Sequence, residues 1–227
     1  MLAFRFGQGM YFPFSTIHYH NVVGIPLSLI GVGLGSLAVA SVASGLLYYV
    51  FTQDWQALPI YAKNFLGVPD GRIGLFLGAN GLMVILLQLP ISYAIDHTSK
   101  VWALLTGAAP FGVSSATLLL TESFLGILVA FAIFFTLAEM ALEVAGAALA
   151  ADLAPARLRG TYLALFGACF GAAYGASPIV AGALLQARLP DLIWEIQLVA
   201  ASLAAVVLVV LQAIGRRLSA TSKKADG

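Results

Sequence analysis

Two carboxylates stand close together in a stretch of the chain that is otherwise free of charge. Glu139 and Glu143 are the only Asp, Glu, Lys or Arg residues between positions 123 and 151. Because they are four residues apart, they share one face of a helix. A charged group near the centre of a bilayer costs roughly 2.5–3.5 kcal/mol, so it usually faces a cavity or a partner. The pair therefore predicts proton coupling or recognition of a cation. The alternative is that Glu143, two turns before Asp152, is solvated at the membrane surface.

Two amides, Asn80 and Gln88, lie eight residues apart and would share a face of another helix. They could hydrogen-bond a substrate or join neighbouring helices, and joining helices is the simpler role. The sequence has no glycine-rich phosphate loop and neither a His-Glu-x-x-His nor a Gly-x-Ser-x-Gly motif. His18 and His20 are two residues apart and do not share a helix face. We therefore expect neither an enzyme, nor a metal site, nor a bound cofactor.

The elements that must position these residues are long and apolar. Of the 227 residues, 61% are hydrophobic and 9% charged, and the formal net charge is only +1. Several long runs carry no Asp, Glu, Lys or Arg, namely 6–53, 73–95, 101–121, 160–187 and 196–215. A helix needs about 20 apolar residues to cross roughly 30 Å of hydrocarbon, whereas barrel strands alternate over about ten residues. We expect an all-α polytopic transmembrane bundle that contacts lipid and binds no nucleic acid.

The charge-free runs predict about seven membrane helices, or eight. The first covers Met1–His20, and the later ones follow in simple alternation at about 72–95, 101–120, 123–151, 156–187 and 191–215. Basic residues concentrate in cytoplasmic loops. Alternation places most of them on one side and only Lys63, Arg72 and Arg188 on the other. The C-terminus, with a basic tail at 216–227, should therefore face the cytoplasm, and the protein should span the cell (plasma or inner) membrane.

The segment from residue 27 to residue 66 has two interpretations. If Met1–His20 starts in the cytoplasm, this segment must cross an even number of times, and two minimal helices with a tight turn near Ser44-Gly45 would just fit. The other interpretation is one crossing from 27 to 52 followed by an interfacial piece, which places the N-terminus outside. The sequence leaves both open.

Three groups of motifs follow one another along the last two-thirds of the chain: Leu58-Pro59-Ile60-Tyr61 with Gly67, Gly74 and Asn80; Gln88-Leu89-Pro90 with Asp96-His97-Thr98-Ser99-Lys100; and Ala151-Asp152-Leu153-Ala154-Pro155 with Arg159-Gly160 and Gly171-x3-Gly175-x2-Pro178-x3-Gly182. In this order they resemble the C-terminal half of a major facilitator superfamily transporter, from its seventh to its twelfth helix. The glycine and proline pattern after Arg159-Gly160 is the most specific. Residues 1–44 resemble the first two helices of the same family, on Phe12-Pro13-Phe14, His20-Asn21-Val22 and Gly24-Ile25-Pro26-Leu27-Ser28.

The basic loop that normally follows the second helix of the family is absent. Instead the chain runs straight into Leu46-Leu47-Tyr48-Tyr49-Val50, which resembles the seventh helix. An internal deletion that joined the second helix to the seventh would explain both this junction and the threading problem. We therefore expect a remnant of helices one and two at 1–44, a bundle resembling the C-terminal half at 45–215 and the basic tail at 216–227.

The resemblance gives roles to further residues. Gln53, Asp54 and Gln56 would lie inside the seventh helix and line the substrate cavity; an interfacial loop is the equally open alternative, since Trp and Tyr are enriched there. A weaker copy of a gating loop, or else a solvated turn, would be formed at the cytoplasmic face by Asp96 and Lys100, with Arg159 in the next loop. A small-residue ladder would let a pliable helix pack closely at a domain interface: Gly167, Gly171, Gly175, Pro178 and Gly182.

The fold and function implied by the resemblance are those of a secondary transporter of a small organic molecule, of the drug or sugar efflux type and coupled to protons. In such folds the substrate site lies near the midplane between two halves. Since the chain offers one convincing half, a homodimer would restore the second. The alternative is a non-transporting, rearranged membrane protein, which is a remnant or packs against the helices of other proteins.

Overall fold

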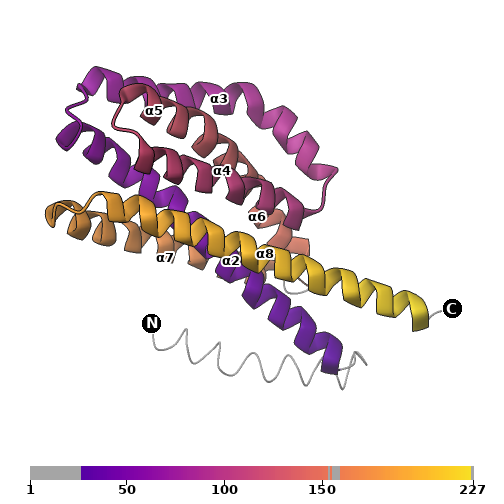
Figure 1. Cartoon of the computed structure of the whole chain (residues 1–227). Helices are drawn as coiled ribbons and strands as arrows, with labels where there is room; N and C mark the ends of the chain where they lie inside the picture. The colour runs from indigo at the N-terminus through magenta and orange to yellow at the C-terminus, as the bar shows by residue number, and fades with distance from the viewer. Residues whose placement is uncertain (1–26, 153, 155–158, 226–227) are drawn as a thin grey trace. The chain divides into compact units, whose positions relative to one another are not determined.

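The computed structural model describes residues 27–152, 154 and 159–225, and within them every regular element is a helix (Figure 1). The elements are α2 (Leu27–Asn64), α3 (Asp70–Asp96), α4 (Lys100–Leu120), α5 (Phe124–Val129), η1 (Ala130–Phe135), α6 (Thr136–Asp152), α7 (Arg159–Gln186) and α8 (Asp191–Ala225). The π-helix η1 joins α5 to α6 without a break, so that the three form one rod. The all-α prediction is confirmed.

Five segments of the described chain are long and apolar enough to cross a membrane: Asp70–Asp96, Lys100–Leu120, Phe124–Asp152, Phe166–Gln186 and Asp191–Ile214. They correspond to the five helices expected in simple alternation. Most ends differ by a few residues, but the span Phe166–Gln186 begins well after the expected start at 156, although α7 itself begins at Arg159. Helices satisfy all their backbone hydrogen bonds internally, which lipid requires. The described bundle is therefore that of a polytopic membrane protein. The predicted helix Met1–His20, with both histidines, lies outside the described residues.

α2 is a single uninterrupted helix of 38 residues. It passes through Ser44 and Gly45 without a turn, so the interpretation with two minimal helices is wrong. It also continues beyond residue 52 to Asn64, so the residues after 52 prolong the same helix. An interfacial position of these residues stays a prediction. No proline lies between residues 27 and 58, and one glycine within a helix costs only about 1 kcal/mol relative to alanine. The domain boundary expected between 44 and 45 falls inside this helix, and the origin of residues 1–44 stays a prediction.

α8 is longer than expected. Its apolar part ends at Ile214, and the helix runs on to Ala225. The basic segment expected as a tail at 216–227 therefore prolongs the helix as far as Ala225. The residues from Gly215 to Ala225 include one glycine and no proline, so nothing in this segment strongly disfavours a helix.

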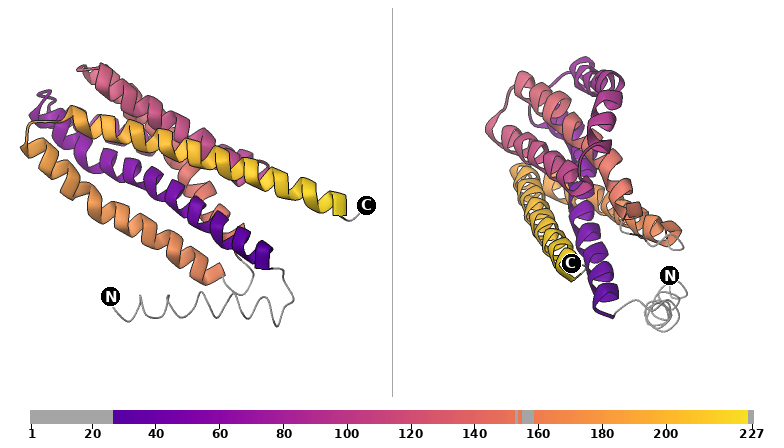
Figure 2. Two further views of the ribbon diagram at one scale, coloured as in Figure 1. Left: turned by 60° about the horizontal axis from the view of Figure 1, so that its bottom comes forward. Right: turned by 90° about the vertical axis from the view of Figure 1, so that its right-hand side faces the viewer.

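By its contacts the chain divides into two units, Met1–Ala38 and Val39–Gly227, and the second contains the helices discussed below. Within it α4 packs along α6 and α8, and α3 packs on η1 and α6. The part of α2 after Val39 lies alongside α7 and α8 (Figure 2), in agreement with the contact of Tyr61 with Trp194. Helix α2 therefore has neighbours on more than one face, which brings polar side chains of several helices together.

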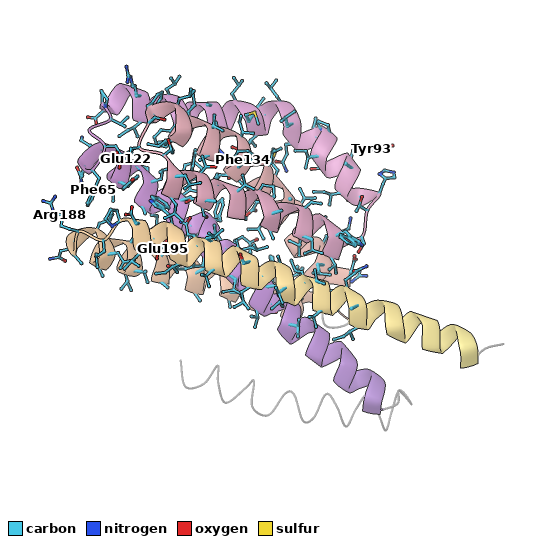
Figure 3. All side chains as sticks on the ribbon, in the orientation of Figure 1. Phe65, Tyr93, Glu122, Phe134, Arg188 and Glu195 are labelled. Carbon is cyan, nitrogen blue, oxygen red and sulfur yellow. The ribbon has the colours of Figure 1, made fainter. Side chains whose placement is uncertain are left out.

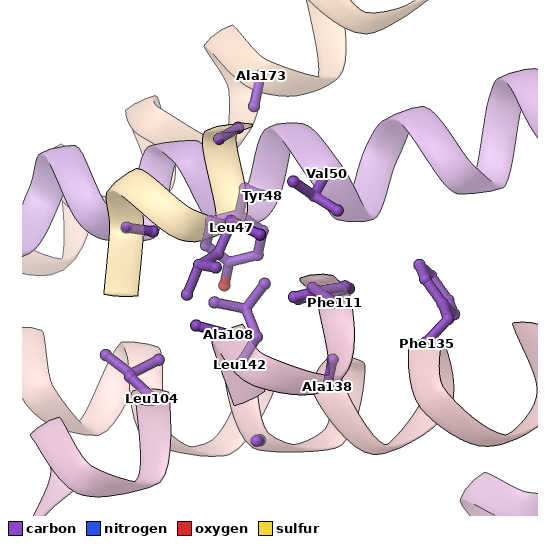
Figure 4. Packing of buried hydrophobic residues seen from close by; sticks show 14 of the residues in the cluster. Leu47, Tyr48, Val50, Leu104, Ala108, Phe111, Phe135, Ala138, Leu142 and Ala173 are labelled. Atoms are coloured by element: carbon purple, nitrogen blue, oxygen red, sulfur yellow. The ribbon is translucent and has the colours of Figure 1, made fainter. Parts of the chain in front are cut away.

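Aromatic rings from α2, α4 and η1 meet in the core of this unit (Figure 4). Phe131 and Phe135 stack with ring centroids 4.5 Å apart. Phe111 of α4 and Phe51 of α2 each pack on Phe135, with centroids at 5.7 Å. Such aromatic pairs contribute about 0.5–1.5 kcal/mol each beyond the area they bury. The rings therefore fix how α2 and α4 sit on the rod.

Two glycines allow α6 to approach its neighbours closely. A β-carbon at Gly107 of α4 would lie 3.0 Å from that of Ala141 and 3.3 Å from the carbonyl oxygen of Ala138. A β-carbon at Gly146 would lie 2.6 Å from the ring of Phe166 in α7. In lipid, where apolar side chains gain little from leaving the solvent, such close packing is a main source of helix association. Both glycines therefore hold α6 in the bundle.

Charged and aromatic side chains hold the end of the bundle where α2 meets α3 and α7 meets α8. Lys63 pairs with Asp70 at 2.8 Å, and the Arg188 guanidinium lies 5.9 Å from the centroid of the Phe65 ring. Figure 3 shows Phe65 and Arg188 at this end and Tyr93 at the opposite one. The chain connections therefore alternate between the two ends, as the order of the helices requires.

Candidate functional site

A polar contact that includes a carboxyl group joins α3 to α6. Asn80 is 3% exposed, and its Nδ2 donates to Oε2 of Glu139 at 2.7 Å and to Oγ1 of Thr136 at 2.9 Å. The Thr136 hydroxyl donates in turn to the carbonyl oxygen of Phe131 at 3.0 Å. Glu139 itself is half-buried. The Asn80 amide therefore ties α3 to the middle of the rod and holds the Glu139 carboxyl group in place.

Helix α2 contributes the third side of this site. The Trp55 indole interacts with the Glu139 carboxyl group, and its ring packs edge-on against Phe131 and Phe135, with centroids 5.7 and 6.4 Å away. Trp55 is 36% exposed. Polar groups of two other helices thus reach Glu139, with aromatic rings beside them. We call Trp55, Asn80, Thr136 and Glu139 the Glu139 cluster.

Glu143 follows one helical turn after Glu139 and is exposed. It acts electrostatically on Glu139 and on Tyr48. Neither glutamate takes part in the ion pairs found among the described residues. The two carboxylates expected on one face are thus near each other, with Glu139 the more enclosed. The exposure of Glu143 does not distinguish water from lipid or a partner, so its functional role and the alternative that it is solvated both stay predictions.

A π-helical turn precedes Glu139 immediately. The Thr136 N–H donates to the carbonyl oxygen of Phe131, five residues earlier, which is the π-helical pattern. Ser114 of α4 donates its hydroxyl to the carbonyl oxygen of Ala130 at 3.0 Å. π-Helical turns inside longer helices occur frequently at functional sites. Sequence reasoning missed this turn, because the run Ala130–Phe135 contains no glycine or proline to mark it.

A second polar contact joins α2 to α7. The Ser177 hydroxyl donates to Oε1 of Gln53, and Nε2 of Gln53 donates to the Tyr49 hydroxyl at 3.2 Å. The neighbouring Thr52 hydroxyl donates to the Tyr48 carbonyl oxygen at 2.9 Å. Gln53 is fully buried. It therefore joins two helices of this chain, and the alternative of an interfacial loop is wrong.

Asp54 is fully buried as well, between α2 and α8. Neither of its carboxyl oxygens makes a hydrogen bond, although Gln197 of α8 approaches them. Gln56, the third polar residue expected at a cavity, is half-buried. Four consecutive residues of α2, from Thr52 to Trp55, thus place polar or aromatic side chains towards α6, α7 or α8.

The remaining predicted residues lie outside the Glu139 cluster. Gln88 is half-buried two turns further along α3. Lys100 pairs with Asp96 at 3.2 Å and also donates to the carbonyl oxygen of Ile95 at 3.1 Å, so it is held within its own turn. Arg159 is exposed at the first position of α7. The gating role of these residues stays a prediction.

The small-residue ladder lies on an open face of α7. β-Carbons at Gly167, Gly171, Gly175 and Gly182 would meet no described atom within 4 Å, and Pro178, inside the helix, is exposed. Among the described residues, close contacts of this kind occur at Gly107 and Gly146 instead. The predicted packing of the ladder therefore remains a prediction about a partner outside the described part of the chain.

Sequence reasoning also missed the partners of the polar residues it singled out. Thr136 pairs with Asn80, Ser177 with Gln53, and Gln197 faces Asp54. Each is a single neutral polar residue in an apolar run. The only signal available was that a polar side chain within a membrane helix usually finds a partner on another helix.

The family model that matches the chain is that of the Major Facilitator Superfamily, over residues 53–227. The match covers more than half of the chain and includes the whole Glu139 cluster. No protein with a curated description matches the chain significantly.

Proposed function

This chain belongs to the Major Facilitator Superfamily, and on that premise we propose that it moves a small organic solute across the cell membrane by secondary active transport, coupled to protons through Glu139. The family implies membrane transport in general. The observation that supports the finer proposal is the hydrogen bond from Asn80 to Glu139, inside a segment long enough to cross the membrane. A carboxyl group at such a place is costly and is usually kept for function.

The hydrogen bond gives the proposal a mechanism. As a carboxylate, Glu139 accepts the Asn80 N–H through Oε2 at 2.7 Å. A proton taken up by the carboxyl group removes its charge and leaves its oxygens weaker acceptors, so the bond from Asn80 becomes one between neutral groups. Protonation would then weaken the tie between α3 and α6, and deprotonation would restore it. A proton can shift a conformational equilibrium only through such a difference between two states.

We propose that a second copy of the chain completes the transporter. The described residues supply six long helical segments, namely α2, α3, α4, the α5–η1–α6 rod, α7 and α8. Substrate sites of such transporters lie near the midplane between two halves. The open face of α7 supports the proposal, since a second backbone could approach Gly171 and Gly175 closely.

We further propose an orientation and a direction. The end that carries Lys100 and Arg159 faces the cytoplasm, because basic residues concentrate on that side. Asp96 and Lys100 would then form a cytoplasmic gate with Arg159, and the solute would leave the cell. Uptake into inside-out vesicles, compared with right-side-out ones, tests the direction.

Transport in proteoliposomes tests the function. Three solutes of different chemistry, a sugar, a lipophilic cation and an organic anion, are offered with and without a pH gradient. Wild type is compared with Glu139→Gln and with the matched control Glu195→Gln, an exposed glutamate on α8 (Figure 3). We expect gradient-driven flux of at least one solute, reduced about tenfold or more in Glu139→Gln and unchanged in the control. Flux indifferent to both the gradient and Glu139→Gln would remove the coupling.

The alternative function is a non-transporting membrane protein that packs against other helices. The open face of α7 favours it as much as it favours a homodimer. Cross-linking in mild detergent separates them, because a dimer is expected of the transporter. A purely monomeric protein that moves none of the solutes would favour the alternative.

A further inference from the structure

Three fully buried polar side chains meet between α2, α4 and α8. Asp54, Gln197 and Ser115 each have no exposed surface, and each comes from a different helix. Ser115 donates its hydroxyl to Oε1 of Gln197 at 3.1 Å or to the carbonyl oxygen of Phe111 at 3.0 Å. We call Asp54, Gln197 and Ser115 the Asp54 site.

The hydrogen-bond capacity of this site is incomplete. Both oxygens of Asp54 and the Nε2 of Gln197 make no hydrogen bond, although the two side chains face each other. A buried polar group left without a partner costs about 1–3 kcal/mol, and more if it is charged. The Asp54 oxygens can accept and Nε2 of Gln197 can donate, yet they are not paired. This indicates that the site binds a ligand or that the same groups adopt a second arrangement.

Among the described residues of the helices α4, α6, α7 and α8, no cation faces Asp54 to balance the negative charge of an ionised carboxylate. Helix α4 has no charged residue between 101 and 120, and α7 has none between 160 and 186. Helix α8 brings only the exposed Glu195 near Gln197, and on α6 Glu139 is engaged by Asn80. A carboxylate removed from water without a cation is far less stable than its neutral form.

We propose that Asp54 is a second proton-binding site, linked through the Gln197 amide to the Ser115 hydroxyl by a hydrogen-bond chain that reverses when the proton leaves. A neutral Asp54 donates its O–H to Oε1 of Gln197. Nε2 of Gln197 then donates to Ser115, and Ser115 donates to Phe111. One oxygen of Asp54, both polar atoms of the Gln197 side chain and the Ser115 hydroxyl are then paired.

Loss of the proton reverses the chain. The proton passes to water that enters when α2 and α8 separate, and the carboxylate then accepts from Nε2 of Gln197. The amide turns over, and its Oε1 accepts from Ser115, as it does in the present structure. The ligand of the site is therefore a single proton. Its loss reverses two hydrogen bonds, Asp54–Gln197 and Gln197–Ser115, and the Ser115 hydroxyl then donates to Gln197 in place of Phe111.

The Asp54 site is distinct from the Glu139 cluster. Successive residues of a helix point about 100° apart. Trp55 therefore reaches Glu139, whereas Asp54 faces Gln197 on α8. The inference does not rest on transport: it stands or falls on the protonation of Asp54, whether or not Glu139 couples a solute.

Infrared spectroscopy of the purified protein in lipid tests it without any solute. A protonated carboxyl group has a carbonyl stretch that shifts in heavy water and that a carboxylate lacks. We expect wild type at neutral pH to show such a band, Asp54→Asn to lose it, and Glu195→Gln to keep it. Loss of transport in Glu139→Gln with this band intact would leave the inference standing. No band in the difference between wild type and Asp54→Asn would overturn it.

A second variant tests the hydrogen bond between Asp54 and Gln197, and it keeps the proposal testable if Asp54→Asn does not fold. Gln197→Leu keeps the acid and removes its partner, so the Asp54 band should move to higher frequency, whereas the matched Gln88→Leu should leave it in place. If the Asp54 band does not move in Gln197→Leu, the proposed hydrogen bond between Asp54 and Gln197 is overturned. Loss of the band when sodium chloride replaces choline chloride at constant pH would make this a cation site and overturn the proton assignment.

Discussion

The contact between Asn80 and Glu139 gives the sharpest quantitative prediction. Asn80→Leu keeps the approximate size of the side chain and removes both hydrogen bonds, to Glu139 at 2.7 Å and to Thr136 at 2.9 Å. Thr136 still donates to the carbonyl oxygen of Phe131, so losing that bond costs about 0.6 kcal/mol, the average for helix contacts in lipid. The bond to Glu139 is worth about 1.5–3 kcal/mol if the acid is ionised.

The free energy of unfolding should therefore fall by about 2–3.5 kcal/mol in Asn80→Leu. In a Glu139→Gln background the lost bond is one between neutral groups, so Asn80→Leu should cost only about 1–1.5 kcal/mol. The difference is a coupling energy of about 1–2 kcal/mol between the two residues. If Glu139 is neutral in the wild type, the coupling energy between Asn80 and Glu139 should be almost zero. The double-mutant cycle of Asn80→Leu and Glu139→Gln therefore reports the protonation state of Glu139.

The assay is unfolding of the purified protein in mixed micelles by added sodium dodecyl sulfate. Gln88→Leu is the matched control, because Gln88 is a half-buried amide on the same helix and outside the Glu139 cluster. The control should cost about 0.5 kcal/mol or less. If Asn80→Leu and Gln88→Leu unfold alike, or if the double variant is additive, the assignment of Glu139 as a carboxylate held by Asn80 is refuted.

Three further predictions concern the bundle. Gly107→Val should lower the free energy of unfolding by about 1–3 kcal/mol, because the added side chain overpacks α4 against α6. The control Gly171→Val lies on the open face of α7 and should leave the stability of a monomer unchanged. The same control should weaken any dimer, which cross-linking would show. Gly67 has φ = 65°, so Gly67→Ala should cost about 1–2 kcal/mol in the same unfolding assay; no loss would contradict the left-handed turn. Ser114→Ala removes the donor to the Ala130 carbonyl oxygen and should cost about 0.6 kcal/mol, and a gain in stability would speak against that bond.

The sequence predicted the helices well where one physical rule decides them. Backbone groups in lipid must be paired within the protein, and a helix pairs them within one segment. A charge-free run of about 20 residues therefore predicts a helix. The rule does not say where one helix ends when an apolar run is longer than the membrane is thick. That is why the sequence leaves open both a turn near Ser44-Gly45 and a single crossing, although Gly45 lies inside a helix of 38 residues.

The candidate site was predicted only as separate residues. Glu139 and Asn80 were singled out because each is polar in an apolar run, but their hydrogen bond depends on how two helices are rotated about their axes. In helices that are apolar nearly all round, the sequence pattern carries little information on rotation. For the same reason the close contacts at Gly107 and Gly146 were not distinguished from the open ladder on α7.

The role of Glu139 is tested most directly by comparing net transport with exchange in Glu139→Gln. Exchange of labelled for unlabelled solute across the proteoliposome membrane requires no net movement of protons, and glutamine resembles the protonated acid in shape and charge. We expect net, gradient-driven transport to fall about tenfold or more while exchange stays within about twofold of wild type. Equal loss of both, or no change in either, would contradict proton coupling through Glu139.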